Sequence, residues 1–241
     1  MLKLVEEKPD VTLEEMREQL DLPIKKSQIS NLLHKAGYHF KKMLYARERD
    51  REDVATRREE WAARQPLLKP SKLVFLDESG INIDFTRLYG RGKGSDRVWD
   101  NVPLNTPQKI TLLSSVRLDG EMVCNYFSGA LTGEVFLNYV EQSLVPHLKK
   151  GDIVIMDNLR AHKVDGVQQA IEQAGAHVLY LPPYSPDFNP IEMLWSKLKS
   201  VLRALKIRNI NTLWEAIPFI FDAVSLADIA SWFQKVGYSL T

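Results

Sequence analysis

The chain has 241 residues, of which 44% are hydrophobic and 26% are charged, so it can bury a sizeable core and is not a disordered polymer. Its net charge of +1 at pH 7 excludes a globally basic nucleic-acid binder, so any contact with nucleic acid must come from local patches. The single cysteine excludes an internal disulfide, and the longest apolar runs are too short to cross a bilayer, so we expect a cytoplasmic protein with no membrane partner.

Residues 1–45 are predicted to form a winged helix-turn-helix module. Thr12 and Glu15 have the spacing of a capping box at the start of a first short helix. A second helix is predicted to begin at a capping Ser27 and to end at Gly37. Two short helices joined by a tight turn are typical of a helix-turn-helix.

The second helix of this module has an apolar and a polar face. Ile29, Leu32 and Leu33 are predicted to face the first helix, which leaves the polar face for a major groove. The basic residues 38–46 after it are predicted to form a wing strand. The side chains expected to contact DNA are Ser27, Gln28, Asn31, Lys35, Lys41 and Lys42. The alternative is a pair of helices that only pack together.

The rest of the chain is predicted to be a linker helix, residues 46–70, and a catalytic domain, residues 71–241. Pro66 and Pro70 end the linker. Asp119-Gly120 is a strong hairpin signal between two of the strands that follow. Strands are expected over residues 72–79, 109–118, 121–129, 152–158 and 177–182, and helices over 133–148, 163–174, 190–205, 212–222 and 226–236. The order βββαβαβα indicates an α/β, ribonuclease H-like fold.

Two aspartates end apolar strands in the same way, since Asp77 follows LVFL and Asp157 follows IVIM. An ionised carboxylate at a buried strand end is costly to desolvate unless a cation compensates it. Oxygen ligands favour Mg²⁺ or Mn²⁺ over zinc. A third acid, Glu192, lies in a predicted helix start with Asn189 as N-cap and Pro190 at the first helical position.

Basic side chains share the predicted exposed face of the Glu192 helix, opposite a buried stripe that includes Trp195 and Leu198. We expect these side chains, Lys199, Arg203 and Lys206, to contact DNA phosphates. Arg91 and Lys93 lie in a glycine-rich segment that lacks the spacing of a phosphate-binding loop, so a flexible DNA-contacting loop is expected there. Asp152 and Asp187 are expected to have structural roles.

Two motifs, MDNLRAH and LPPYSPDFNPIEMLWSKLK, resemble the catalytic core of DDE-type transposases of the mariner-type superfamily, in its bacterial insertion-sequence branch. The 34 residues between Asp157 and Glu192 match the spacing of that branch. The resemblance implies that Asp77, Asp157 and Glu192 hold two Mg²⁺ or Mn²⁺ ions for phosphodiester cleavage and strand transfer. It also implies that Asn158 and His162 support the ligands or contact DNA.

The resemblance covers residues 72 to about 238 and implies a transposase. Its expected partner is double-stranded DNA, both the element's terminal repeats and the target, bound by a homodimer near the bacterial nucleoid. Members usually have two DNA-binding modules, and residues 1–45 match the second. Two alternatives stay open: a transposon-derived DNA-binding protein that no longer cuts, and a ribonuclease H-like nuclease that acts on RNA–DNA hybrids.

Overall fold

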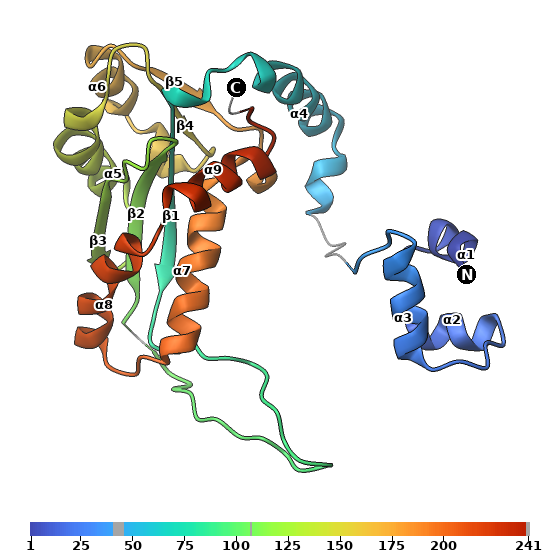
Figure 1. Cartoon of the computed structure of the whole chain (residues 1–241). Coiled ribbons are helices and arrows are strands. Elements are labelled where there is room, and N and C mark those ends of the chain that lie inside the picture. Colours follow the sequence, from blue (N-terminus) through green and yellow to red (C-terminus); the bar gives the residue numbers. More distant parts are fainter. Residues whose placement is uncertain (41–45, 107, 240–241) are drawn as a thin grey trace. The chain divides into compact units, whose positions relative to one another are not determined.

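The computed structural model describes residues 1–40, 46–106 and 108–239 (Figure 1). The chain divides into two compact units, Met1–Arg47 and Glu48–Thr241. The predicted linker helix, observed as α4 (Glu52–Arg64), belongs to the larger unit because Trp61 is buried in that unit's core.

The smaller unit contains three short helices: α1 (Leu2–Glu7), α2 (Leu13–Gln19) and α3 (Lys26–Lys35). Helix α1 was not predicted from the sequence. The capping box of α2 is confirmed, because the Glu15 N–H donates to Oγ1 of Thr12 at 3.2 Å and the Thr12 N–H donates to Oε2 of Glu15 at 2.8 Å. Met16 and Ile29 provide the buried apolar contact that this pair of helices needs.

The start of α3 was predicted incorrectly. Lys25, rather than Ser27, is the N-cap, because the Gln28 side chain reaches back and accepts a hydrogen bond from the Lys25 N–H at 2.9 Å. Ser27 therefore lies inside the first turn. Its hydroxyl is exposed there and does not cap the helix.

The two faces of α3 largely follow the prediction. The buried stripe runs from Ile29 to Leu33, four residues on, so Leu32 lies at its margin and is 46% exposed instead of packed inward. The proposed DNA-contacting side chains of this helix are all exposed: Ser27, Gln28, Asn31 and Lys35. The predicted contacts Lys41 and Lys42 lie outside the described residues.

The larger unit is built on a five-stranded mixed sheet of order β3-β2-β1-β4-β5. The strands are β1 (Leu73–Ile81), β2 (Ile110–Arg117), β3 (Cys124–Ser128), β4 (Ile153–Met156) and β5 (His177–Tyr180). The predicted hairpin is confirmed, because β2 pairs antiparallel with both β1 and β3. β4 and β5 run parallel to β1. This arrangement confirms the predicted α/β class.

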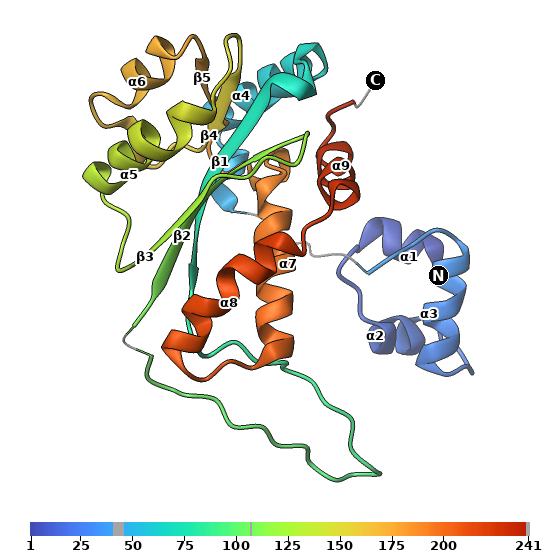
Figure 2. The same ribbon diagram turned by 60° about the vertical axis from the view of Figure 1, so that its left-hand side comes forward.

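Helices cover both faces of the sheet (Figures 1 and 2). On one side lie α5 (Gly133–Tyr139), capped by Thr132 as predicted, and α6 (Val167–Gln173). On the other lie α7 (Ile191–Leu205), α8 (Ile210–Asp222) and α9 (Leu226–Lys235). β1 serves both cores, since its alternate side chains point to opposite faces: Leu73 and Phe75 pack with α7 to α9, and Val74 and Leu76 with α5 and α6.

Within the described ranges, no single helix is long and apolar enough to span a membrane, although α8 and α9, bent by 79° at their junction, pass the length and composition test as a pair. Leu213, Ile217, Ile229 and Phe233 of these two helices are buried in the core of the larger unit.

A long excursion connects β1 to β2 and projects away from the sheet in both views (Figures 1 and 2). Its described residues, 82–106 and 108–109, form no helix or strand. Arg91 and Lys93 are exposed on it, as expected for a loop. Their contact with DNA stays a prediction.

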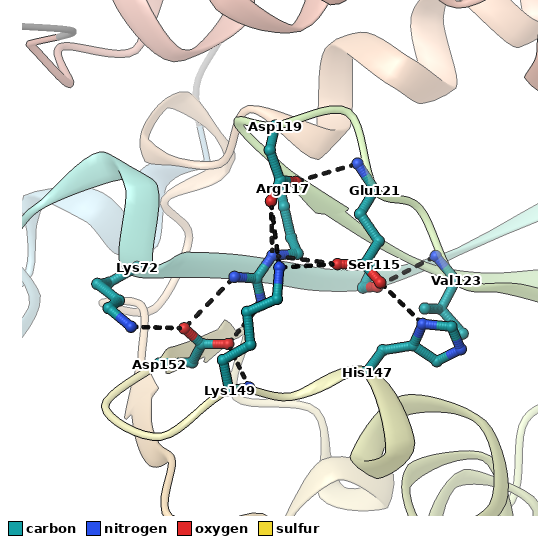
Figure 3. Close-up of polar contacts among 9 residues, drawn as sticks. All are labelled: Lys72, Ser115, Arg117, Asp119, Glu121, Val123, His147, Lys149 and Asp152. Atoms are coloured by element: carbon teal, nitrogen blue, oxygen red, sulfur yellow. Dashed lines mark hydrogen bonds and ion pairs between the residues drawn. The ribbon is translucent and has the colours of Figure 1, made fainter.

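A buried ion pair joins β2 to the start of β4 (Figure 3). Nη1 of Arg117 lies 2.5 Å from Oδ2 of Asp152, and both side chains are buried. The Lys149 N–H also donates to Oδ2 of Asp152 at 2.8 Å, while Nε of Arg117 lies 3.7 Å from Asp119. Asp152 therefore has the structural role that was expected of it.

Arg117→Met is expected to destabilise the protein by about 3–5 kcal/mol, because it leaves the buried Asp152 carboxylate without its main partner. Urea unfolding measures the change. The matched control is Lys149→Met, whose exposed ammonium lies 3.5 Å from Asp119 and should contribute at most about 1 kcal/mol. Equal losses in the two variants would contradict the assignment of a buried, stabilising pair.

Candidate active site

Asp77, within β1, and Asp157, which follows β4, lie at the same level of two neighbouring parallel strands. Phe75 of β1 is opposite Ile155 of β4, and the two aspartates each follow two residues later. Because β4 ends at Met156, β1 pairs only with β2 at Asp77 and continues to Ile81. The prediction that Asp77 ends its strand was therefore wrong, although the side chain lies at the expected edge of the parallel pairing.

Asp77 is an unusually desolvated carboxylate. It is 8% exposed, and Oδ2 accepts a hydrogen bond from the indole Nε1 of Trp195 at 3.1 Å. Burial, followed by the negative charges of Glu78 and Glu192, raises the pKa of Asp77 to about 8, an increase that the Trp195 hydrogen bond opposes. Trp195 was predicted only as a core residue, and its polar contact with Asp77 was missed. A nearby cation would favour the ionised form of Asp77.

Asp157 is held in its ionised form by the loop that follows it. Oδ1 accepts the Leu159 N–H at 2.8 Å and lies 2.7 Å from Nδ1 of His162. Burial opposes ionisation of Asp157, but the His162 and Leu159 contacts outweigh it and lower the pKa. Both contacts are made to the same oxygen, so they fix the direction of the carboxylate.

His162 is fully buried between two carboxylates. Its Nε2 lies 3.1 Å from Oε2 of Glu78, its Nδ1 faces Asp157, and its ring packs on Phe136 with 4.3 Å between centroids. Burial alone would lower the pKa of His162, but Asp157 and Glu78 raise it to about 9. The sequence motif identified His162. It did not identify Glu78, whose only signal was its position beside Asp77.

Glu192 lies in the first turn of α7, and its side chain is exposed. Partial desolvation raises its pKa, Lys199 lowers it, and Asp157 and Glu78 raise it further, so the net change is upward. Glu192 also raises the pKa of Asp77. Glu192 therefore interacts electrostatically with both strand aspartates, one on β1 and one after β4.

Asn189 does not cap α7 as predicted. Pro190 occupies the N-cap position, and the backbone carbonyl of Asn189 accepts the Glu192 N–H at 3.3 Å. The Asn189 side chain is buried, and its Oδ1 lacks a hydrogen-bond partner among the described residues. This oxygen therefore makes no capping hydrogen bond to the described first turn of α7.

The three predicted ligands have the chemistry of a divalent-metal site. Their donors are carboxylate oxygens, which Mg²⁺ and Mn²⁺ prefer. The charge of Glu192 raises the pKa of Asp77, and the charge of Asp157 raises the pKa of Glu192. Across residues 1–40, 46–106 and 108–239, no group of three or more His, Cys, Asp or Glu side chains is already arranged to hold a metal ion. The residue types and charges fit a cation, and metal binding by these residues stays a prediction.

Asn158 supports the loop after β4. Its Nδ2 donates to the carbonyl of Leu181, and its Oδ1 accepts a hydrogen bond from Nζ of Lys163 at 2.7 Å. Nζ of Lys163 also lies 4.9 Å from the centre of the Tyr180 ring. The polar atoms of Asn158 thus join the β4 loop to the end of β5, and its role beside the ligands or at DNA stays a prediction.

The predicted basic row on α7 is present but its members differ. Lys199 is half-buried, whereas Arg203 is exposed, with its guanidinium 5.4 Å from the centre of the Phe85 ring. Nζ of Lys206 lies 2.6 Å from Oδ2 of Asp100, in the excursion between β1 and β2. Lys206 is therefore already paired, which the sequence alone did not indicate.

Comparison with known proteins identifies a family and similar solved structures. The family model for the DDE superfamily endonuclease matches residues 72–214. The mariner Mos1 paired end complex with Mg has a TM-score of 0.71 at 17% identity and covers 98% of this chain and 74% of that one. The Mos1 strand transfer complex has a TM-score of 0.68 at 18% identity and covers 98% and 73%.

The catalytic domain of Mos1 mariner transposase has a TM-score of 0.55 at 13% identity, and the match covers 82% of this chain and 92% of that domain. At these identities the likeness establishes the fold, so the predicted ribonuclease H-like architecture is confirmed. No curated protein sequence matches the chain.

Proposed function

Because the chain belongs to the DDE superfamily endonuclease family, we propose that it is a transposase that cuts double-stranded DNA at the ends of a mobile element and joins the resulting 3′-hydroxyl to target DNA. The observation that carries this proposal is the grouping of Asp77 and Asp157 at one level of β1 and β4, with the charge of Glu192 acting on both. The structurally similar Mos1 structures include a paired-end complex with the left transposon end and a strand transfer complex, which supports the same reaction class.

The residues of the site divide into proposed metal ligands and residues that orient those ligands. Asp77, Asp157 and Glu192 would hold two Mg²⁺ or Mn²⁺ ions, which when bound supply Lewis-acid activation of the attacking oxygen and stabilise the leaving oxygen. Trp195 orients Asp77 through its indole N–H. His162 orients Asp157 and is itself held by Glu78.

The 34 residues between Asp157 and Glu192 support assignment to the bacterial insertion-sequence branch, in which a homodimer acts on DNA in the cytoplasm. A ribonuclease H-like nuclease would share the fold, and a DNA-binding protein without activity would share the N-terminal helices. All three acids of the predicted triad are present, which favours an active enzyme over the second alternative.

A cleavage assay tests the proposed function. The purified chain is incubated with double-stranded DNA from the flanks of its own coding sequence, or with an RNA–DNA hybrid of the same sequence, in Mg²⁺, Mn²⁺, Ca²⁺ or chelator. We expect strand cleavage of the DNA duplex in Mg²⁺ and Mn²⁺ only. Cleavage in chelator, or a preference for the hybrid, would overturn the proposal.

The DNA-contacting residues stay proposals of the same kind. They are Ser27, Gln28, Asn31 and Lys35 on α3, Arg91 and Lys93 on the excursion, and Lys199 and Arg203 on α7. Lys206 takes a smaller part, because its ammonium is paired with Asp100.

Replacing Lys199 and Arg203 together with Ala is expected to weaken DNA binding across sequences. Each lost phosphate contact should flatten the slope of log affinity against log salt concentration by about 0.9. Binding is measured in Ca²⁺ over a series of salt concentrations. The matched control is Lys206→Ala, which should change the slope less, and an unchanged slope in the double variant would show that the two side chains are only solvated.

A further inference from the structure

Arg58 of α4 binds the loop that leads into α7. Its guanidinium forms a bidentate pair with Asp187, with Nη1 to Oδ1 at 3.0 Å and Nη2 to Oδ2 at 2.7 Å. Nη1 also donates to Oγ of Ser185 at 2.6 Å, and the same guanidinium lies 4.7 Å from the centre of the Phe188 ring. One side chain of the predicted linker helix thus makes three kinds of contact with a loop more than a hundred residues away.

The burial and charge of this contact distinguish it from an ordinary surface pair. The Arg58 side chain is 15% exposed, and Nη2 of Arg49 approaches the same Asp187 carboxylate at 3.3 Å. Burial alone would raise the pKa of Asp187, but the two arginines outweigh it, and the pKa lies below its usual value. A bidentate arginine–carboxylate pair fixes direction as well as distance.

Backbone hydrogen bonds connect the loop that Arg58 contacts to Glu192. The Phe188 N–H donates to Ser185 O at 3.1 Å, and the Asn189 N–H donates to Pro186 O at 3.1 Å. The Glu192 N–H then donates to Asn189 O at 3.3 Å in the first turn of α7. A run of hydrogen-bonded turns therefore joins the residues that Arg58 contacts to the backbone of Glu192.

We propose that Arg58 is a positioning residue for Glu192, acting through Asp187, Ser185 and Phe188. The inference rests on the proposed function, in which Glu192 is a metal ligand. The exposed Glu192 side chain lies in the first turn of α7, five residues beyond Asp187, so the position of the loop before the helix affects where its carboxylate lies. A misplacement of about 1 Å at a reacting centre can slow an enzyme by about a hundredfold.

Hydrogen exchange of the metal-free protein tests the structural half of the inference. Arg58→Ala should speed exchange of the Phe188, Asn189 and Glu192 amides by about tenfold or more, since their hydrogen bonds depend on the anchored loop. The matched control is Arg51→Ala, because Arg51 begins the same helix and bonds only to the exposed Asp53 among the contacts described. Unchanged exchange at all three amides in Arg58→Ala would overturn the proposal.

Mn²⁺ binding and cleavage of duplex DNA test the functional half. Arg58→Ala should weaken Mn²⁺ binding and slow cleavage by about 10- to 100-fold, with DNA affinity in Ca²⁺ unchanged. In a Glu192→Gln background, the same Arg58→Ala change should cause no further loss of Mn²⁺ affinity, because the carboxylate that it positions is absent. Additive losses would instead show that Arg58 acts only on general stability, and would overturn the inference.

The two proposals fail in different ways. A wild-type chain that binds no Mn²⁺ and cuts no DNA would refute the proposed function, whereas wild-type binding and cleavage with an unaffected Arg58→Ala would refute only the role of Arg58. Asp187→Asn is the second variant if Arg58→Ala does not fold. It keeps the size of a partly exposed side chain, removes the charge, and should reproduce the exchange and Mn²⁺ defects.

Discussion

Glu192→Gln is expected to abolish DNA cleavage while leaving the fold and DNA affinity intact. The amide keeps the size of the side chain but loses the negative charge with which Glu192 would hold a divalent ion. The helix should survive the change, because Leu194, Trp195 and Leu198 anchor α7 in the core and Glu192 itself is exposed. Cleavage in Mg²⁺ and Mn²⁺, DNA affinity in Ca²⁺ and thermal unfolding are measured on the same preparation.

The stability of this variant without metal should equal or slightly exceed that of the wild type. The wild-type carboxylate lies in the negative field of Asp157 and Glu78, so removing its charge relieves repulsion. Glu215→Gln, an exposed substitution on α8, is the matched control and should cleave normally. Wild-type cleavage rates in Glu192→Gln would mean that Glu192 is not a ligand of the catalytic metal.

The sequence predicted the sheet and two strand-edge acids because both are local patterns. The apolar run LVFL contributes side chains to both cores. Leu73 and Phe75 face one layer of helices, and Val74 and Leu76 face the other. IVIM forms the neighbouring parallel strand, so Asp77 and Asp157, the acids that follow the two runs, lie at the same level of the sheet. The predicted strand over 72–79 ended two residues before Ile81, because the pairing of β1 with β2 beyond Asp77 depends on a partner remote in sequence.

The supporting contacts of the site could not be predicted, because they join residues far apart in the chain. Trp195 follows the helical period of a core residue, and nothing local indicates that its indole N–H reaches Asp77. Glu78 and His162 are separated by more than eighty residues, and Arg58 belongs to a helix whose mixed charge is typical of a solvated linker. Charge and periodicity describe which face a residue occupies, whereas partners depend on the tertiary fold.

Asp77→Asn is expected to stabilise the metal-free protein by a few kcal/mol at pH 8 to 9. Burial and the charges of Glu78 and Glu192 raise the pKa of Asp77 to about 8 in the folded protein. Each unit by which a pKa differs between the folded and unfolded states changes the free energy of unfolding by about 1.4 kcal/mol. Asparagine removes the buried charge, and its carbonyl oxygen can still accept the Trp195 indole hydrogen bond. Urea unfolding in chelator, at several pH values, measures the difference.

The gain should depend on pH in a defined direction. Between about pH 4 and pH 8 the unfolded chain has lost the Asp77 proton while the folded chain retains it, so wild-type stability falls as pH rises, and above about pH 8 this loss is complete. His162 titrates in both proteins, so the difference between them isolates Asp77. Mg²⁺ should narrow the difference, because a ligand at 100 times its dissociation constant stabilises the wild type by about 2.7 kcal/mol, whereas the variant has lost one of the proposed ligands. A variant that is less stable than the wild type in chelator at pH 9, or equally stabilised by Mg²⁺, would show that Asp77 is a structural carboxylate.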